Sequence, residues 1–300
     1  MTVYFNVVEK KLLEAFPSPL IVASLHLAIG VACMVPLWLL GIRKPPKLSP
    51  YQARLLAPVA FWHGLQHAMG TSSMAAGSMG GAHLVKAAEP FFSVLMSWLL
   101  AGERYHPLVL LCLIPVVGGV MVAAGEMTLT QSVIAYSSMA NIAVACRGVT
   151  AKSASIAINR EKENMCAVKM FAVLTTMSFG MLLPIALIRE GATVLQAWER
   201  ADKSHGSSYL TKELLWSSLL YYITNELAFV VCSKLGPVTY SVSNTVKRAA
   251  ILLASTVVFG ATVSGRGLAG AAASLLGAMS YGVAKVSFPP LEKLSVKKQV

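Results

Sequence analysis

Long apolar stretches separated by short charged or turn-rich breaks dominate the pattern of this chain. A helix needs about 20 apolar residues to cross the hydrocarbon core of a bilayer. Segments of that size between the breaks predict nine spanning helices, at Pro19–Ile42, Tyr51–Thr71, Gly81–Leu100, Pro107–Ala124, Ser132–Ser155, Cys166–Ile188, Leu214–Lys234, Val238–Phe259 and Leu268–Val286. The opening segment, Met1–Phe16, is too short to span and carries four charged side chains. We interpret it as the tail of a tenth helix whose first half precedes this sequence.

Two of the predicted helices share a short pattern around a lysine. Lys86 lies in Leu-Val-Lys-Ala-Ala and Lys247 in Thr-Val-Lys-Arg-Ala-Ala, each a few residues into its span. Two halves of five helices each would be inverted relative to one another, because five is odd, and their lysine helices would meet near the midplane. We therefore expect an all-α polytopic membrane protein of about ten helices built as two inverted five-helix repeats. A single transmembrane domain would cover 1–300, with half-repeats at about 1–125 and 126–290 and a basic tail at 291–300.

The charged loops indicate the orientation of the chain. When loops are counted alternately, those with Arg43, with Arg104 and with Arg160 fall on the same side as both termini. The positive-inside tendency makes this side the cytosolic face or its organelle equivalent. The longest loop, Glu190–Lys212, is expected to be a solvated connector with an interfacial helix around Val194–Trp198.

The composition agrees with a membrane protein. Hydrophobic residues make up 56% of the chain and charged residues 13%, with a mean hydropathy of +0.65. A soluble protein carries about 25% charged residues. The formal net charge of +12 does not indicate a nucleic-acid binder, because many of the cations sit in short loops or inside apolar runs. It favours contact with anionic lipids and an anionic cargo.

Neither a disulfide framework nor a metal cluster is indicated by the cysteines. The five cysteines have no paired spacing, and four of them lie within apolar segments, where small buried side chains are the ordinary reading. No cleavable signal or transit peptide is visible at the amino end.

Lysine and arginine occur inside two apolar runs: Ala82–Phe92 contains Lys86, and Ser243–Leu252 contains Lys247 beside Arg248. One such charge at the centre of a membrane helix costs about 2.5–3.5 kcal/mol on insertion scales. One interpretation is that these side chains reach to the interface from near helix ends. However, Lys247 and Arg248 lie about 100° apart around a helix, so both cannot reach one interface equally well. We therefore favour binding of an anionic cargo.

A polar stripe runs along the helix predicted at Tyr51–Thr71. Its members recur at spacings of three and four residues, which places them on one helix face. They are His63, Gln66, His67, Gly70 and Thr71. Hydrogen bonding between helices and contact with cargo explain this stripe equally well.

Lys86 has polar neighbours on its own helix. His83 precedes it by one turn and shares its face. Glu89 follows three residues later, and we interpret it as an intrahelical partner that keeps the lysine charged in the empty protein. Pro90 is expected to kink this helix beside the charge.

Two further polar sets lie in later helices. One runs from Tyr221 to Glu226 and includes Tyr222 and Thr224. The other is Asn141 with Arg147, which sits near mid-span and needs either an internal carboxylate or an anionic ligand. Glu226 is a conceivable partner for Arg147, and both interpretations of this arginine stay open.

Four patterns are similar to those of one known family. They are Phe5-Asn6-Val7-Val8-Glu9-Lys10-Lys11 followed by Phe16-Pro17, the stretch His83–Phe92, the stretch Gly236–Arg248, and the spacing Asn141, Arg147, Lys152. Together they resemble the motifs of the plastid phosphate translocators, which are sugar-phosphate/phosphate antiporters of the drug/metabolite transporter superfamily. The resemblance covers nearly the whole chain.

The resemblance implies ten helices and a central site. In that site Lys86, Lys247 and Arg248 would hold the phosphate, and His67 would help to bind the cargo. Where members usually carry a tyrosine this chain has Thr224, and the usual threonine at position 70 is glycine, followed by Thr71. The candidate substrate-binding residues are Lys86, Lys247, Arg248, His67, Thr71, Arg147, Tyr222 and Thr224.

The function that the resemblance implies is an antiporter. It would exchange inorganic phosphate for triose phosphate, 3-phosphoglycerate or phosphoenolpyruvate by alternating access, across the envelope of a chloroplast or of a non-photosynthetic plastid such as an apicoplast. The alternative is a nucleotide-sugar or other organic-anion exchanger of the same superfamily, which nucleotides would inhibit. Catalysis is not expected, because a membrane enzyme needs a nucleophile with a base, or a metal cluster, deep in its helices. We expect no cofactor; the expected partners are the cargo and membrane lipids, with no nucleic acid.

Overall fold

Helices form all of the regular secondary structure in the computed structural model, which describes residues 1–126, 129–160, 166–234, 237–260 and 264–290. The elements are α1 (Thr2–Ala15), α2 (Pro19–Leu39), α3 (Pro50–Ala76), α4 (Met79–Lys86), α5 (Glu89–Met96), the π-helix η1 (Ser97–Ala101), α6 (Pro107–Leu111), α7 (Leu113–Glu126), α8 (Gln131–Arg160), α9 (Ala167–His205), α10 (Ser207–Lys234), α11 (Pro237–Phe259) and α12 (Gly265–Ser287). With α4, α5 and η1 taken as one broken helix and α6 and α7 as another, the described residues form about ten helices. The prediction of an all-α fold of about ten helices is confirmed.

Six helical stretches within the described residues are long and apolar enough to cross a membrane. They correspond to six of the nine predicted spans. The other three predicted spans form α3, α8 and α11, which are long helices but are not among those six. These three helices carry His67, Asn141 and Lys247, so their polar content is linked to the site described below.

Side chains at the helix ends explain several boundaries. The Ser49 hydroxyl accepts a hydrogen bond from the backbone N–H of Gln52, and the backbone N–H of Ser49 donates to Oε1 of Gln52. This capping box opens α3 just before Pro50. The Ser78 hydroxyl accepts from the N–H of Gly81 at 3.0 Å and opens α4 in the same manner.

The helix expected around Val194–Trp198 is present as part of α9, but the loop expected over the rest of Glu190–Lys212 is wrong. α9 continues to His205 and α10 begins at Ser207, so a single glycine separates them. Gly206 has a φ of +85°, a conformation that side-chain-bearing residues rarely adopt, which permits the abrupt turn. Apolar packing holds the extension: the rings of Trp198 and Phe16 lie 5.6 Å apart between centroids, and Leu210 is fully buried.

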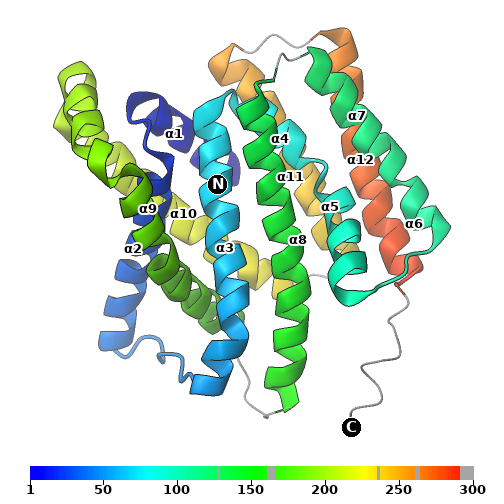
Figure 1. The fold of residues 1–300 in the computed structure, drawn as a ribbon, viewed down its shortest axis with the longest axis horizontal. Coiled ribbons are helices and arrows are strands. Elements are labelled where there is room, and N and C mark those ends of the chain that lie inside the picture. The colour runs from blue at the N-terminus through cyan, green and yellow to red at the C-terminus, as the bar shows by residue number, and fades with distance from the viewer. Residues whose placement is uncertain (127–128, 161–165, 235–236, 261–263, 291–300) are drawn as a thin grey trace.

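Close helix contact is built from glycines where α7 meets α12, the pair that runs side by side in Figure 1. A Cβ on Gly119 would lie 2.4 Å from the carbonyl oxygen of Gly270, and one on Gly270 would lie 2.7 Å from the carbonyl oxygen of Gly119. Both distances are too short for a carbon atom, so the two backbones approach this closely only because neither residue has a side chain.

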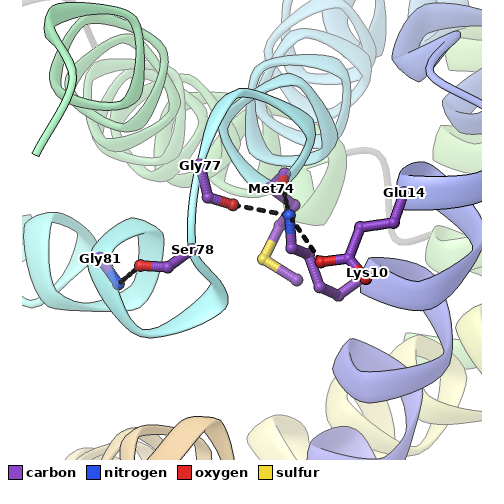
Figure 2. A network of polar contacts seen from close by, with 6 residues as sticks. All are labelled: Lys10, Glu14, Met74, Gly77, Ser78 and Gly81. Carbon is purple, nitrogen blue, oxygen red and sulfur yellow. Dashed lines mark hydrogen bonds and ion pairs between the residues drawn. The ribbon is translucent and has the colours of Figure 1, made fainter. Parts of the chain in front are cut away.

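The short helix α1 is tied to the carboxyl end of α3 by Lys10 (Figure 2). Its ammonium group donates to the carbonyl oxygens of Met74 at 3.0 Å and Gly77 at 2.8 Å, and it lies 3.4 Å from the Glu14 carboxylate. A cation at this place satisfies carbonyls that have no partner within the helix. The contact fixes α1 so that the neighbouring residue, Glu9, faces the interior.

Candidate functional site

A cavity of about 240 Å³ lies between α1, α3, α4, α8, α10 and α11, with Glu89 from the first turn of α5 also in its wall. Its lining comes from both predicted half-repeats. Six of the eight candidate residues line it: Lys86, Lys247, Arg248, His67, Thr71 and Thr224. Lys86 and Lys247, which were expected to meet, both line this cavity.

The helix that carries Lys86 is broken, as expected from Pro90. α4 ends at Lys86, and α5 begins at Glu89 after a turn of two alanines. Pro90 has no N–H to donate to the carbonyl of Lys86, four residues earlier. That carbonyl instead accepts a hydrogen bond from Nη1 of Arg248, whose Nη2 forms an ion pair with Oε2 of Glu89. Thus Glu89 is a partner of Arg248, which corrects its interpretation as an intrahelical partner of Lys86.

The two lysines of the cavity are placed differently. Lys86 extends toward α3, where a Cβ at position 70 would lie 3.1 Å from its Nζ. Gly70 therefore leaves room for this ammonium group. Lys247 is exposed to the cavity. Among the described residues, no hydrogen bond or ion pair engages the Nζ of either lysine, so both ammonium groups are available to an anion.

His67 is held by a chain of side chains that reaches α2 and α10. Its Nε2 lies 3.3 Å from Nδ1 of His26, and Nε2 of His26 lies 3.1 Å from the Ser217 hydroxyl. Because that hydroxyl donates to the carbonyl of Leu214, it accepts from His26, and His26 in turn accepts from His67. The ring of Tyr221 stacks on His67 at 4.1 Å between centroids.

Two polar pairs join α1 to the cavity wall. The Thr71 hydroxyl donates to Oε1 of Glu9 at 2.9 Å. His83 Nε2 lies 2.8 Å from Oδ1 of Asn6, which accepts because the Asn6 amide nitrogen donates to the carbonyl of Thr2. Thr71 therefore reaches the cavity with its hydroxyl already used by a carboxylate.

The hydroxyl of Thr224 differs from that of Thr71. Its Oγ1 is buried and has no hydrogen-bond partner among the described residues, and Oε1 of Gln66 is in the same state. Both residues line the cavity. A buried polar atom without a partner is destabilising, so these two atoms are ready to bind a polar group of a cargo.

Arg147 and Tyr222 do not line the cavity. The Nη1 of Arg147 donates to Nδ1 of His63 at 3.1 Å, and Tyr222 packs in an apolar cluster with Phe171. Glu226, considered above as a partner for Arg147, instead forms an ion pair with Arg43 at 2.7 Å.

The sequence-based predictions give no role at the site to three polar residues of this region. Glu9 and Asn6 line the cavity, and His26 supports His67 from behind. The spacing of Asn6 and Glu9, three residues apart on one helix face, was a signal in the sequence. The charged residues around this pair also fit the exposed tail of a helix, so the spacing alone does not identify a site.

A larger cavity of about 620 Å³ lies between α2, α3 and α9. Apolar side chains form most of its wall, and its charged residues are one arginine and one glutamate, Arg189 and Glu190. The Glu190 carboxylate is already bonded to the backbone N–H groups of Leu20 and Ile21 at the start of α2. The smaller cavity, with three cations, is therefore the better candidate for an anion.

Comparison with known proteins adds an independent line of argument. The model of the Triose-phosphate Transporter family matches residues 1–282 of this chain. Phosphoenolpyruvate/phosphate translocator 1, chloroplastic, of Oryza sativa subsp. japonica is 30% identical over 284 residues, which cover 94% of this chain and 69% of that protein.

Two further relatives are equally similar. Glucose-6-phosphate/phosphate translocator 1, chloroplastic, of Arabidopsis thaliana is 30% identical over 288 residues, covering 95% of this chain and 73% of that protein. Triose phosphate/phosphate translocator, chloroplastic, of Solanum tuberosum is 30% identical over 287 residues, covering 95% and 68%. Identity is the same for relatives named after different cargoes, so it does not choose among those cargoes.

Proposed function

This chain belongs to the triose-phosphate transporter family, and we propose that it exchanges inorganic phosphate for phosphorylated three-carbon metabolites across a plastid-type envelope membrane. Triose phosphate, 3-phosphoglycerate and phosphoenolpyruvate are the proposed cargoes. The relatives named above are phosphate translocators described as chloroplastic, which supports both the reaction and the membrane.

The observation that carries this proposal is the meeting of three cations in one cavity. Lys86 comes from the first half of the chain, and Lys247 and Arg248 come from the second. A phosphate monoester carries a charge of about −1.5 to −2 near neutral pH and offers three acceptor oxygens. The guanidinium of Arg248 can hold two of these oxygens at once, while the lysines act as point charges.

Exchange follows from the charge of the empty cavity. The described lining residues include three cations, Lys86, Lys247 and Arg248, and two carboxyl groups, Glu9 and Glu89, which leaves a net positive charge when all are ionised. Closing the empty cavity would strip the water that screens this charge, which is costly in a medium of low dielectric constant. A carrier loaded with phosphate would close more readily, so one anion must enter for another to leave.

Alternating access requires two bodies that move about the site. We assign these to the half-repeats at about 1–125 and 126–290, inverted relative to one another, because each contributes cations to the cavity. Arg248 bridges them through its contacts with the Lys86 carbonyl and Glu89.

The size of the cavity favours a small cargo over a nucleotide sugar. Pockets for drug-sized ligands measure about 300–1,000 Å³. The cavity here measures about 240 Å³, which is below that range. A phosphorylated three-carbon molecule suits it better than a nucleotide does.

The test is uptake of labelled phosphate into vesicles that contain the purified protein and are preloaded in parallel with phosphate, triose phosphate, 3-phosphoglycerate, phosphoenolpyruvate, glucose 6-phosphate or a nucleotide sugar. We expect uptake with the three-carbon loads and little with the nucleotide sugar. Uptake that only a nucleotide sugar supports would show that the alternative exchanger is correct.

A further inference from the structure

Glu9 has no role in holding cargo, yet its carboxyl group lies in the cargo cavity. It comes from α1, its exposed fraction is 4%, and its Oε1 accepts a hydrogen bond from Thr71. Its second oxygen, Oε2, accepts no hydrogen bond among the described residues. A carboxylate in an anion site opposes the binding of an anion, so its presence needs an explanation.

Charged and titratable groups face Glu9 from several neighbouring elements. Lys86 interacts with it electrostatically from α4, and Tyr221 does so from α10. The others in the wall of the cavity are His67 on α3, His83 on α4, Glu89 on α5, and Lys247 and Arg248 on α11. On α1 itself, Lys10 turns away to the end of α3 and pairs with Glu14 (Figure 2). α9 packs against the far end of α1, where Trp198 contacts Phe16.

The charges balance only when Glu9 is neutral. With Glu9 and Glu89 both ionised, the three cations leave one net positive charge in the lining, which is too little for a dianion. A proton on Glu9 raises the lining to two net positive charges and removes the repulsion between the carboxylate and the entering phosphate. The complex of cavity and dianion is then neutral, which a low-dielectric interior favours.

We propose that Glu9 takes up one proton from water when a phosphate dianion enters the cavity, so that each dianionic cargo is carried together with a proton. The proton leaves a hydronium ion or a buffer acid in solution and adds to Oε2 of Glu9, and it returns to solution when the cargo leaves. This proposal rests on the proposed function and adds a proton-binding step to it.

The histidines are poorer acceptors for this proton. In His67 and in His83 the nitrogen that already carries a proton is Nε2, which donates to His26 and to Asn6 respectively, so one more proton on Nδ1 would create a buried imidazolium cation. Burial favours the uncharged form of a side chain, which is the protonated form of a carboxyl group and the unprotonated form of an imidazole. When an anion enters the cavity, Glu9 therefore takes up a proton before either histidine does.

Isothermal titration calorimetry on the purified full chain tests this step. Glycerol 3-phosphate is titrated at several pH values from 7.5 to 9, where a phosphate monoester with a second pKa of about 6 is already dianionic. Repeating each titration in buffers with different ionisation enthalpies gives the number of protons taken up per bound cargo. For the unmodified protein we expect close to one proton, and an affinity that falls about tenfold per pH unit where uptake is complete.

Glu9→Gln keeps the shape of the side chain and cannot take up a proton. We expect it to bind glycerol 3-phosphate with about one proton fewer taken up per cargo than the unmodified protein, and with a correspondingly weaker dependence of affinity on pH. Glu14→Gln is the matched control, because Glu14 lies on the same helix, is 51% exposed and pairs with Lys10 away from the cavity. It should behave like the unmodified protein.

Two results would overturn the proposal while leaving the proposed function in place: cargo binding without proton uptake in the unmodified protein, or unchanged proton uptake in Glu9→Gln. If the unmodified protein binds no phosphate ester at all, the proposed function fails as well. Should Glu9→Gln not fold, infrared difference spectra of the unmodified protein provide a second readout. A protonated carboxyl band must appear when cargo is added, and its absence refutes the proposal.

Discussion

Glu89 competes with the cargo for Arg248, and replacing it should strengthen phosphate binding. In the structure, Oε2 of Glu89 forms an ion pair with Nη2 of Arg248, and a phosphate held by two guanidinium nitrogens would need that contact. Glu89→Gln keeps the size of the side chain and an amide oxygen that can still accept a hydrogen bond, but it removes the negative charge. An incoming phosphate then displaces a neutral amide from Arg248 instead of a carboxylate, which costs less free energy.

The strength of the ion pair between Arg248 and Glu89 sets the size of the expected change in phosphate affinity. The side chains of Arg248 and Glu89 are 16% and 31% exposed, so water still screens them in part. Pairs of this kind are worth up to about 1 kcal/mol, which corresponds to an affinity change of about fivefold. The loss of one negative charge from the cavity acts in the same direction, so we expect the dissociation constant for phosphate to fall about fivefold.

Calorimetric titration of inorganic phosphate into the purified protein measures this change directly. Glu14→Gln again serves as the control for loss of an acidic residue outside the cavity. If Glu89→Gln binds phosphate more weakly than the unmodified protein, while its thermal unfolding is unchanged, Glu89 is orienting Arg248 for the cargo and the competition argument is wrong.

Three further changes test other parts of the account. Arg248→Lys should weaken phosphate binding at least about tenfold, because a point charge cannot keep both guanidinium contacts, and charge-assisted hydrogen bonds are worth about 1.5–3 kcal/mol; binding within a factor of two of the original would contradict a two-nitrogen contact. Gly119→Ala should destabilise the fold by about 1–3 kcal/mol, because its Cβ would collide with the carbonyl of Gly270. Gly118→Ala is the control and should not destabilise the fold, because its Cβ would meet nothing within 4 Å. Equal thermal unfolding of the two variants would argue against the close contact of α7 and α12. Lys10→Met should lower the unfolding temperature in detergent, because each carbonyl left without a donor costs about 1–3 kcal/mol. Lys11→Met is the control, because Lys11 is exposed. An equal effect of both changes would show that the cap on α3 contributes nothing to stability.

The number and order of helices could be predicted from the sequence because apolar length is a local property. The same approach failed at Glu190–Lys212, where mixed charges and Ser-His-Gly-Ser-Ser suggested a loop. These residues form the ends of α9 and α10, because Trp198 and Leu210 pack against other helices. Tertiary contacts outweighed local polarity there.

The cations of the site could be predicted, but most of their partners could not. Lys86, Lys247 and Arg248 stood out because each charge interrupts an apolar run. The pairing of Arg248 with Glu89 joins residues 159 positions apart, and the local spacing suggested a different partner. Arg147 illustrates the opposite limit: its position in mid-span is unusual in sequence, yet the structure places it against His63 and outside the cavity lining.

The structure tests only part of the hypothesis of two inverted repeats. Five-helix units predicted that the two lysine helices would reach one place, and they do line one cavity. The inverted relation between the halves stays a prediction, because a shared cavity can arise without it.

Exchange without leakage is the central claim, and one measurement tests it most directly. Purified protein is placed in vesicles loaded with labelled phosphate, and efflux is followed with and without unlabelled phosphate or triose phosphate outside. Because the empty cavity retains positive charge, we expect efflux to be at least about tenfold faster with counter-substrate, equivalent to a barrier difference of about 1.4 kcal/mol. Equal rates under both conditions would contradict the account, since the empty carrier would then reorient as readily as the loaded one.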